Sequence, residues 1–314
     1  MTISYIGCAT DSQTRYKATS GGVGSAILKY LFDNKIIQTS ITFDYNHNEL
    51  QYIPRLIYKY EDYNITGSIY HEIKLIQFIK QHIHEIRGSF ACFVLPCQAR
   101  AIRSMLEKAD IPNLLIGLTC SSQQSIEATY YLLKRMKINQ EDVYKIQYRG
   151  NGWPSGIQIT LNNHTNKFIP NNNSIWTEIF HSKLFIQKRC FSCNNTLNEY
   201  SDIALADPWL KEYIQKEKEG KSIILCHSKK GAEIVHKTSD CQYIKFENIE
   251  YQKVLQSQIF TITRKKQYRY NQRIINIIYH IYNNKIYRQS VLKHEKLFRL
   301  HNKLKNIFEN LILR

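Results

Sequence analysis

Glycine and proline are scarce in this sequence of 314 residues, with only 12 and 6 copies. Collagen-like and low-complexity chains need many of both, so the composition excludes those classes. No apolar run approaches the roughly 18 residues that a membrane-spanning helix needs. The start of the chain has neither a basic nor an apolar segment, so we expect no signal peptide and a cytoplasmic protein.

Acidic residues are also few, because 26 Asp and Glu oppose 43 Lys and Arg and leave a net charge of +17. The excess is concentrated in residues 261–314, which contain 13 basic residues but only Glu295 and Glu309 as acids. The abundance of Lys, Asn, Ile and Tyr is typical of an AT-rich genome, so the charge is weak evidence for nucleic acid, which we do not expect as a partner. Hydrophobic residues make up 43 % of the chain, enough to fill one large domain or two modest ones.

The order of strand and helix patterns predicts an α/β fold. An apolar strand at 89–95 is followed by a helix that begins at Pro96, and a second apolar strand at 114–118 precedes another helix at 126–136. This order is a βαβ unit with parallel strands, so we expect a sheet with βαβ units and flanking helices. Further strands are expected at 39–43, 157–161, 200–206 and 222–226, and further helices at 71–83 and over 271–314.

A cysteine follows each strand of this unit. Parallel strands place their carboxyl ends at one edge of a sheet, where open α/β folds bind ligands. We therefore expect Cys97 and Cys120 to converge at that edge. Each also precedes a predicted helix, and the partial positive charge of a helix N-terminus favours the thiolate.

Cys190 and Cys193 form a Cys-x2-Cys pair without the strand and helix that flank a thioredoxin-like dithiol. Together with Cys97 and Cys120 they provide four soft ligands, which suit zinc or an iron–sulfur cluster. Two ligands from separate strand ends fit a cluster recessed in the edge of a sheet better than a zinc ribbon. The other cysteines are expected to be small buried hydrophobic residues; they are Cys8, Cys92, Cys226 and Cys241.

The segment Ser20-Gly21-Gly22-Val23-Gly24 is a glycine-rich turn that leads into a helix. It matches neither a Walker A motif, because no Gly-Lys-Ser/Thr follows, nor Gly-x-Gly-x-x-Gly. Free amides at a helix start can cradle a phosphate, but a plain tight turn explains the pattern equally well. The histidines show no metal-ligand spacing, and we expect His71, His82 and His84 on the solvated face of a helix.

The basic C-terminal segment contains an amphipathic helical pattern. Its apolar stripe consists of Leu297, Leu300, Leu304, Ile307 and Leu311, with Lys296, Arg299, Lys303 and Lys305 as flanking residues. A basic amphipathic helix suits the anionic surface of the inner membrane or an acidic partner. The pattern is equally consistent with a stripe that packs on the α/β body.

Several sequence blocks carry a family resemblance. They are Ala18-Thr-Ser-Gly-Gly-Val23, Leu95-Pro-Cys-Gln98, Gly117-Leu-Thr-Cys120, Tyr148-Arg-Gly-Asn-Gly-Trp-Pro-Ser-Gly156, and Arg189-Cys-Phe-Ser-Cys193 leading into Asp202-Ile-Ala-Leu-Ala-Asp-Pro-Trp209. With these blocks in this order, the chain resembles the beta subunits of coenzyme F-420 hydrogenases and dehydrogenases. This family includes the chlorophyll-cycle hydroxymethyl reductases, and the resemblance covers about residues 1–240.

The resemblance implies an oxidoreductase with FAD and a 4Fe–4S cluster. It implies that the cluster ligands are Cys97, Cys120, Cys190 and Cys193. The residues implied at the flavin are Thr19, Ser20, Gly21, Gly22 and Val23, a second block of Gly67, Ser68 and Tyr70, and Asn151 and Asp207 near the cluster or the isoalloxazine. We then expect a flavin and iron–sulfur domain over 1–260 and a basic amphipathic helical tail over 261–314.

Two departures from the family pattern bear on function. Many members begin with a ferredoxin-like segment of closely spaced cysteines, where this chain has only Cys8, and the tail is not part of the pattern. Short forms of this kind resemble proteins of bacterial polysaccharide biosynthesis. The expected electron donor is a ferredoxin or a reduced flavin, deazaflavin or nicotinamide coenzyme. The rival hypothesis is a non-enzymatic zinc protein with four cysteine ligands, whose basic tail binds nucleic acid or an anionic partner.

Overall fold

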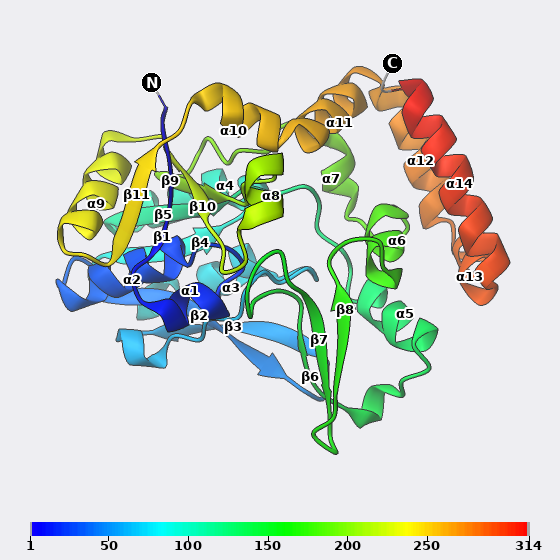
Figure 1. Cartoon of the computed structure of the whole chain (residues 1–314), viewed down its shortest axis with the longest axis horizontal. Helices are drawn as coiled ribbons and strands as arrows, with labels where there is room; N and C mark the ends of the chain where they lie inside the picture. Colours follow the sequence, from blue (N-terminus) through cyan, green and yellow to red (C-terminus); the bar gives the residue numbers. More distant parts are fainter. Residues whose placement is uncertain (1, 313–314) are drawn as a thin grey trace.

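The computed structural model describes residues 2–312 as a large sheet, a small sheet and a C-terminal group of helices (Figure 1). The large sheet has eight strands in the order β11-β1-β10-β9-β5-β4-β2-β3. The strands are β1 (Ile3–Ala9), β2 (Thr39–Asn46), β3 (Gln51–Ile57), β4 (Phe90–Val94), β5 (Asn113–Leu118), β9 (Ile203–Ala206), β10 (Ser222–Cys226) and β11 (Ile244–Asn248). The fold is therefore of the α/β class that the sequence predicts.

The centre of the large sheet is parallel and its two flanks are antiparallel. β4 pairs in parallel with β2 and β5, and β5 pairs in parallel with β9. The helix α4 (Pro96–Lys108) connects β4 to β5, which confirms the predicted βαβ unit. β3 closes one flank, and β10, β1 and β11 extend the other, all by antiparallel pairing.

Helices cover both faces of this sheet, which is why its central strands are continuous apolar runs. α2 and α9 pack on the face that presents Leu114 and Ile116, whereas α3 and α4 pack on the face that presents Cys92 and Leu115. Alternate residues of one strand thus enter different cores. The helices around the sheet are α1 (Ser12–Lys17), α2 (Val23–Asp33), α3 (Leu75–His82), α8 (Lys211–Lys216), α9 (Lys229–Asp240) and α10 (Tyr251–Ser257).

Between β5 and its spatial neighbour β9, the chain leaves the large sheet and builds a second unit. This unit has the antiparallel sheet β6-β7-β8 and a core that includes Tyr148, Trp176 and Phe185. Its elements are α5 (Glu127–Arg135), β6 (Val143–Gln147), β7 (Gly156–Leu161), β8 (Asn166–Pro170), α6 (Ile175–His181) and α7 (Lys188–Ser192).

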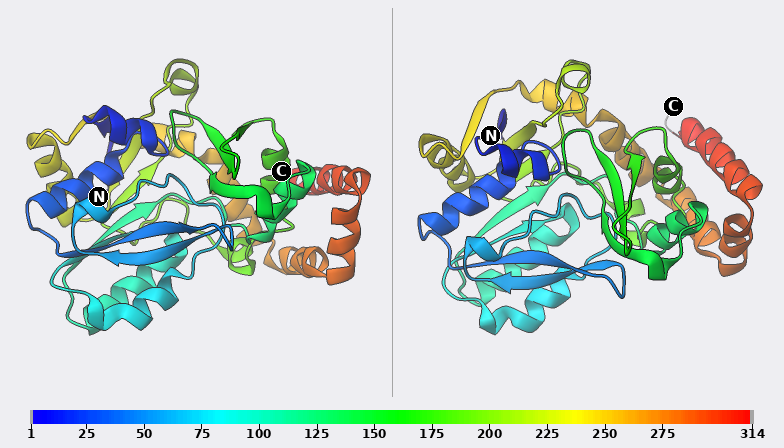
Figure 2. Two further views of the ribbon diagram at one scale, coloured as in Figure 1. Left: turned by 90° about the horizontal axis from the view of Figure 1, so that it is seen from below. Right: turned by 60° about the horizontal axis from the view of Figure 1, so that its bottom comes forward.

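The C-terminal helices form one end of the molecule, drawn in orange and red in Figure 2. They are α11 (Ile259–Tyr270), α12 (Gln272–Asn283), α13 (Lys285–Lys293) and α14 (Glu295–Ile312). α14 is anchored by Phe298, which is fully buried in the core of the second unit. The expected domain boundary between residues 260 and 261 lies inside α11. Among residues 2–312, no helix is long and apolar enough to cross a membrane.

One helix prediction needs correction. The helix expected at 71–83 begins only at Leu75, because His71 lies in an isolated bridge with Gln124. His71 is 1 % exposed and accepts a hydrogen bond from the backbone amide of Tyr52, so it is not on a solvated face. The helix predicted at 126–136 is α5 (Glu127–Arg135), so its position is confirmed, and it packs in the core of the second unit.

Candidate functional site

Cys97 is placed by the tight connection between β4 and α4. α4 begins at Pro96, which needs no amide donor at this position, and Gln98 accepts a hydrogen bond from the amide of Leu95 at 2.9 Å. Cys97 therefore lies in the first turn of the helix, at the carboxyl end of β4. This is the position that the βαβ pattern predicts.

Cys120 follows β5 in a loop that neighbouring segments hold in place. The amide of Thr119 donates to the carbonyl of Leu205, and the amide of Cys120 donates to the carbonyl of Thr196. Cys120 does not stand at a helix N-terminus, so the dipole argument fails for this residue. Burial instead raises the pKa of the Cys120 thiol to about 12. Burial also raises the pKa of Cys190 and of Cys97, so the first turn of α4 does not hold Cys97 as a thiolate either.

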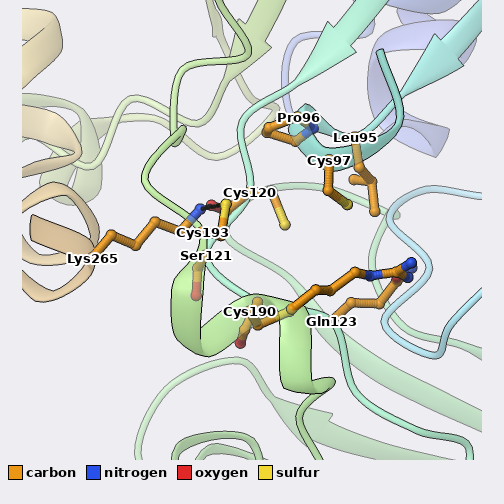
Figure 3. A pocket seen from close by; sticks show the side chains of 11 residues that line it. Leu95, Pro96, Cys97, Cys120, Ser121, Gln123, Cys190, Cys193 and Lys265 are labelled. Atoms are coloured by element: carbon orange, nitrogen blue, oxygen red, sulfur yellow. Dashed lines mark hydrogen bonds between the residues drawn. The ribbon is translucent and has the colours of Figure 1, made fainter. Parts of the chain in front are cut away.

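All four predicted cysteine ligands line one small pocket (Figure 3). Cys190 lies on α7 and Cys193 directly follows it, so the Cys-x2-Cys pair meets the two strand-end cysteines as expected. All cysteines of the described chain are free thiols. Within residues 2–312, no three or more His, Cys, Asp or Glu side chains are arranged to hold a metal ion.

The remaining cysteines lie away from this pocket. Cys8, Cys92 and Cys226 are buried in the large sheet, as the sequence predicts, but Cys241 is exposed after α9. The prediction of a buried side chain was wrong for Cys241, because this residue follows the end of α9 on its solvent side.

Lys265 was missed by the sequence analysis, which assigned it to the tail. Its ammonium donates to the carbonyls of Cys120 at 2.7 Å and Asn195 at 2.9 Å, and lies 3.4 Å from Sγ of Cys193. Lys265 is only 3 % exposed. The neighbouring Arg264 donates to the carbonyl and hydroxyl of Ser121. The helix α11 thus forms one wall of the cysteine pocket, and no sequence pattern pointed to it.

A cavity of about 720 Å³ adjoins the cysteine pocket. It lies at the carboxyl ends of β4, β5 and β9, the edge at which open α/β sheets bind ligands. Eight of the predicted flavin residues line it: Thr19, Ser20, Gly22, Val23, Gly67, Ser68, Tyr70 and Asp207. The hydroxyls of Thr19 and Ser68 are 3.1 Å apart, which joins the two predicted blocks on one wall.

Two predicted flavin residues do not line the cavity. A side chain at Gly21 would come within 2.6 Å of the Gly7 carbonyl oxygen and the Ser222 amide nitrogen, so this glycine is required by packing on the sheet. Asn151 is exposed in a turn, and its amide donates to Gln158. The sequence motif locates the turn correctly, but Asn151 is not the side chain of this turn that faces the cavity.

The inward-facing residue of that turn is Arg149. Its guanidinium is 3 % exposed and donates to both carboxylate oxygens of Asp207, at 3.2 and 3.1 Å, and to the carbonyl of Thr19 at 3.0 Å. Burial, the largest single influence, would lower the pKa of Arg149, but Asp207 and Tyr70 together outweigh it and hold the pKa above its ordinary value. The indole of Trp153 also donates to Asp207, at 2.7 Å. The second unit is thus tied to the cavity wall through a buried ion pair.

Fold and site together define an α/β protein with four cysteines beside a ligand-sized cavity at the carboxyl edge of its sheet. The family model for the N-terminal part of the coenzyme F420 hydrogenase/dehydrogenase beta subunit matches residues 4–80, and the model for the C-terminal part of the same subunit matches residues 88–252. The chain therefore belongs to the coenzyme F420 hydrogenase/dehydrogenase beta subunit family, which makes it a protein of the oxidoreductase type.

A solved structure has the same fold. A chain of the F420-reducing [NiFe] hydrogenase complex from Methanosarcina barkeri superposes with a TM-score of 0.64 at 16 % sequence identity, over 84 % of this chain and 90 % of that chain. A search of curated proteins finds no significant match. The helices α11 to α14 lie outside the residues that the family models match.

Proposed function

We propose that this chain is an oxidoreductase that binds FAD in the large cavity and a 4Fe–4S cluster at Cys97, Cys120, Cys190 and Cys193. The observation that supports the proposal most directly is that the cysteine pocket and the large cavity share a wall. Five residues line both the cysteine pocket and the cavity: Leu95, Cys120, Ser121, Ser122 and Gln123. A bound flavin would trade hydride with a substrate and single electrons with a cluster.

The donor set of the small pocket fits a cluster better than a single zinc ion. Zinc draws four thiolates to about 2.3 Å each, so its ligands must lie close together. A cubane binds one thiolate at each of its irons, so its ligands are spread around a wider volume. Two of the four free cysteines that line this pocket follow the separate strands β4 and β5, which supports a cluster recessed in the edge of the sheet over a zinc ribbon.

The cavity suits a flavin nucleotide in size and lining. Its volume of about 720 Å³ lies within the range of pockets for extended small ligands. The N-terminus of α2 contributes backbone amides from Gly22 onward, which favour phosphate. Aromatic side chains on the wall, such as Tyr70 and Trp209, offer surfaces for a planar ring. The buried Nε of Arg149 has no hydrogen-bond partner among the described residues and is a free donor for a ligand atom.

Within this proposal the electron partner is a ferredoxin or a reduced flavin, deazaflavin or nicotinamide coenzyme. The substrate belongs to bacterial polysaccharide biosynthesis, and the protein works in the cytoplasm or at the inner face of the membrane. The shared wall supports an electron route from an outer partner to the cavity through the cysteine pocket, because Cys97 is exposed.

Anaerobic purification tests the proposal, followed by iron, sulfide, zinc and flavin analysis. We expect about four irons and one FAD for each chain. Cys190→Ser should lose most of the iron, whereas Cys226→Ser, at a buried cysteine outside the pocket, should retain it. A colourless protein with one tightly bound zinc would reject the proposal in favour of the zinc alternative.

A further inference from the structure

The last helix, α14, is held to the protein by one side only. Phe298, His301 and Lys305 are 0, 3 and 5 % exposed, and Lys305 forms an ion pair with Glu309. Lys305 is therefore part of the buried face and not of the basic flank that the sequence suggests. The apolar stripe lies about a third of a turn around the helix from these residues, because each residue advances about 100°.

The apolar stripe of α14 faces solvent, so it does not pack on the α/β body. The exposed fractions are 40 % for Leu297, 51 % for Leu300, 57 % for Leu304, 51 % for Ile307 and 67 % for Leu311. These five side chains extend over about 20 Å of helix. Single exposed aliphatic residues are normal on soluble proteins, but a continuous row of this length marks a contact surface.

The helix α12 repeats this arrangement. Its Ile275 is buried at 1 % exposure, whereas Ile274, Ile277 and Ile281 are exposed at 46, 61 and 46 %. Both helices belong to the group of helices at the end of the molecule in Figure 2.

The charge next to the stripe is positive and uncompensated. Lys296 and Lys303 are exposed and lie four and three residues from Leu300, on the adjoining face of α14. Both acids of residues 261–314 are already engaged, since Glu295 pairs with Arg299 and Arg135, and Glu309 with Lys305. A partner for this surface must therefore be anionic as well as apolar.

We propose that α12 and α14 dock this protein onto an anionic lipid surface, with the aliphatic stripes in the acyl boundary and the lysines among the headgroups. Aliphatic residues beside lysines are the composition of interfacial helices. Protein interfaces are instead depleted in Lys, and their hot spots are rich in Trp, Tyr and Arg and poor in Leu. A second copy of the chain would bring like charges together, which opposes self-association through this surface.

Cosedimentation of the full-length protein with vesicles tests the docking. Vesicles of phosphatidylglycerol and phosphatidylcholine should bind the protein at low salt, and phosphatidylcholine alone should not. The variant Lys296→Gln/Lys303→Gln should bind on the order of 25-fold more weakly, since each basic residue near an anionic surface contributes about fivefold. The variant Leu300→Ser/Leu304→Ser should also lose binding, and its fold should persist because both side chains are exposed.

A charge-matched control separates docking from general attraction. Lys80→Gln/Lys237→Gln removes two exposed lysines from α3 and α9 and should leave vesicle binding unchanged. Equal loss in this control, or failure of the wild-type protein to bind anionic vesicles, would overturn the proposal. Concentration-dependent dimerisation that Leu300→Ser/Leu304→Ser abolishes would assign the stripe to a second copy instead. None of these readouts depends on flavin or iron.

Discussion

The ammonium of Lys265 lies 3.4 Å from Sγ of Cys193 and binds the carbonyl of Cys120, so one side chain of α11 joins two of the three segments that carry the four cysteines. A positive charge beside the cysteines favours whichever state of a bound cluster is more negative, which is the reduced state. Lys265→Met should therefore lower the reduction potential of the cluster, by on the order of 50 mV, as a redox titration followed by EPR would measure.

The matched control for this prediction is Lys266→Met, one residue along α11 but exposed. It should leave the potential unchanged. Iron content should be compared first, because loss of iron from Lys265→Met would show that the lysine holds the pocket together rather than tuning it. The same shift in both variants would rule out a specific role for Lys265.

Asp207 neutralises a guanidinium that is almost completely buried. Asp207→Asn keeps the size of the side chain but leaves Arg149 without its counter-charge, and an uncompensated buried charge costs about 3–5 kcal/mol. We expect the free energy of unfolding to fall by about 3 kcal/mol in urea titrations. Glu212→Gln, which breaks the exposed pair with Lys253, should change it by less than about 1 kcal/mol. Similar small losses in both variants would contradict a structural role for the buried pair.

Substitutions at Gly21 and at Thr19 should affect different properties, the stability of the fold and the affinity for flavin. Gly21→Ala places a methyl group against the backbone of Gly7 and Ser222 and should destabilise the fold by about 1–3 kcal/mol. Thr19→Val removes a hydroxyl from the cavity wall without adding bulk and should weaken flavin binding severalfold, with a loss of stability of only about 1 kcal/mol from the hydrogen bond to Ser68. Flavin titration and thermal unfolding check both expectations. Unchanged flavin affinity in Thr19→Val would mean that this wall does not contact the flavin.

His71 should make the protein sensitive to acid. Its ring is 1 % exposed, and burial lowers its pKa, against a smaller opposing effect of the Glu72 carbonyl. Below the ordinary pKa of about 6.5 the imidazole gains a proton in the unfolded chain, while the folded protein keeps it neutral down to a lower pH. The contribution of His71 to the free energy of unfolding should therefore fall as the pH drops below 6.5, by at most about 1.4 kcal/mol for each pH unit, until the pH reaches the lowered pKa.

His71→Gln should flatten this pH profile, measured by urea titration at each pH. The glutamine amide oxygen can still accept the hydrogen bond that the Tyr52 amide donates to Nε2 of His71, but it does not titrate. His84→Gln, at an exposed position, provides the comparison and should leave the profile of the wild type. A profile that keeps its full slope in His71→Gln would assign the effect to other buried groups.

The parts of the site that the sequence predicts are those that follow strands. Cys97 and Cys120 were predicted to converge because the carboxyl ends of parallel strands share an edge, and that rule depends only on the order of elements. Lys265 could not be found this way, because its helix reaches the pocket through tertiary packing and no local pattern marks it. Gly21 and Asn151 show the second limit: a motif locates a turn, but the backbone conformation decides which of its residues faces the cavity.

The excursion of residues 119–202 between β5 and β9 has a consequence for how such proteins diversify. Cys120 lies where the chain departs from the large sheet, and Cys190 and Cys193 lie shortly before it returns. The strands on either side are hydrogen-bonded neighbours, so the ends of the excursion are fixed whatever its length or content. Insertions, deletions or exchange of the intervening elements can therefore reshape the cavity wall for a new substrate, while the thiols near both ends of the excursion keep their positions in space.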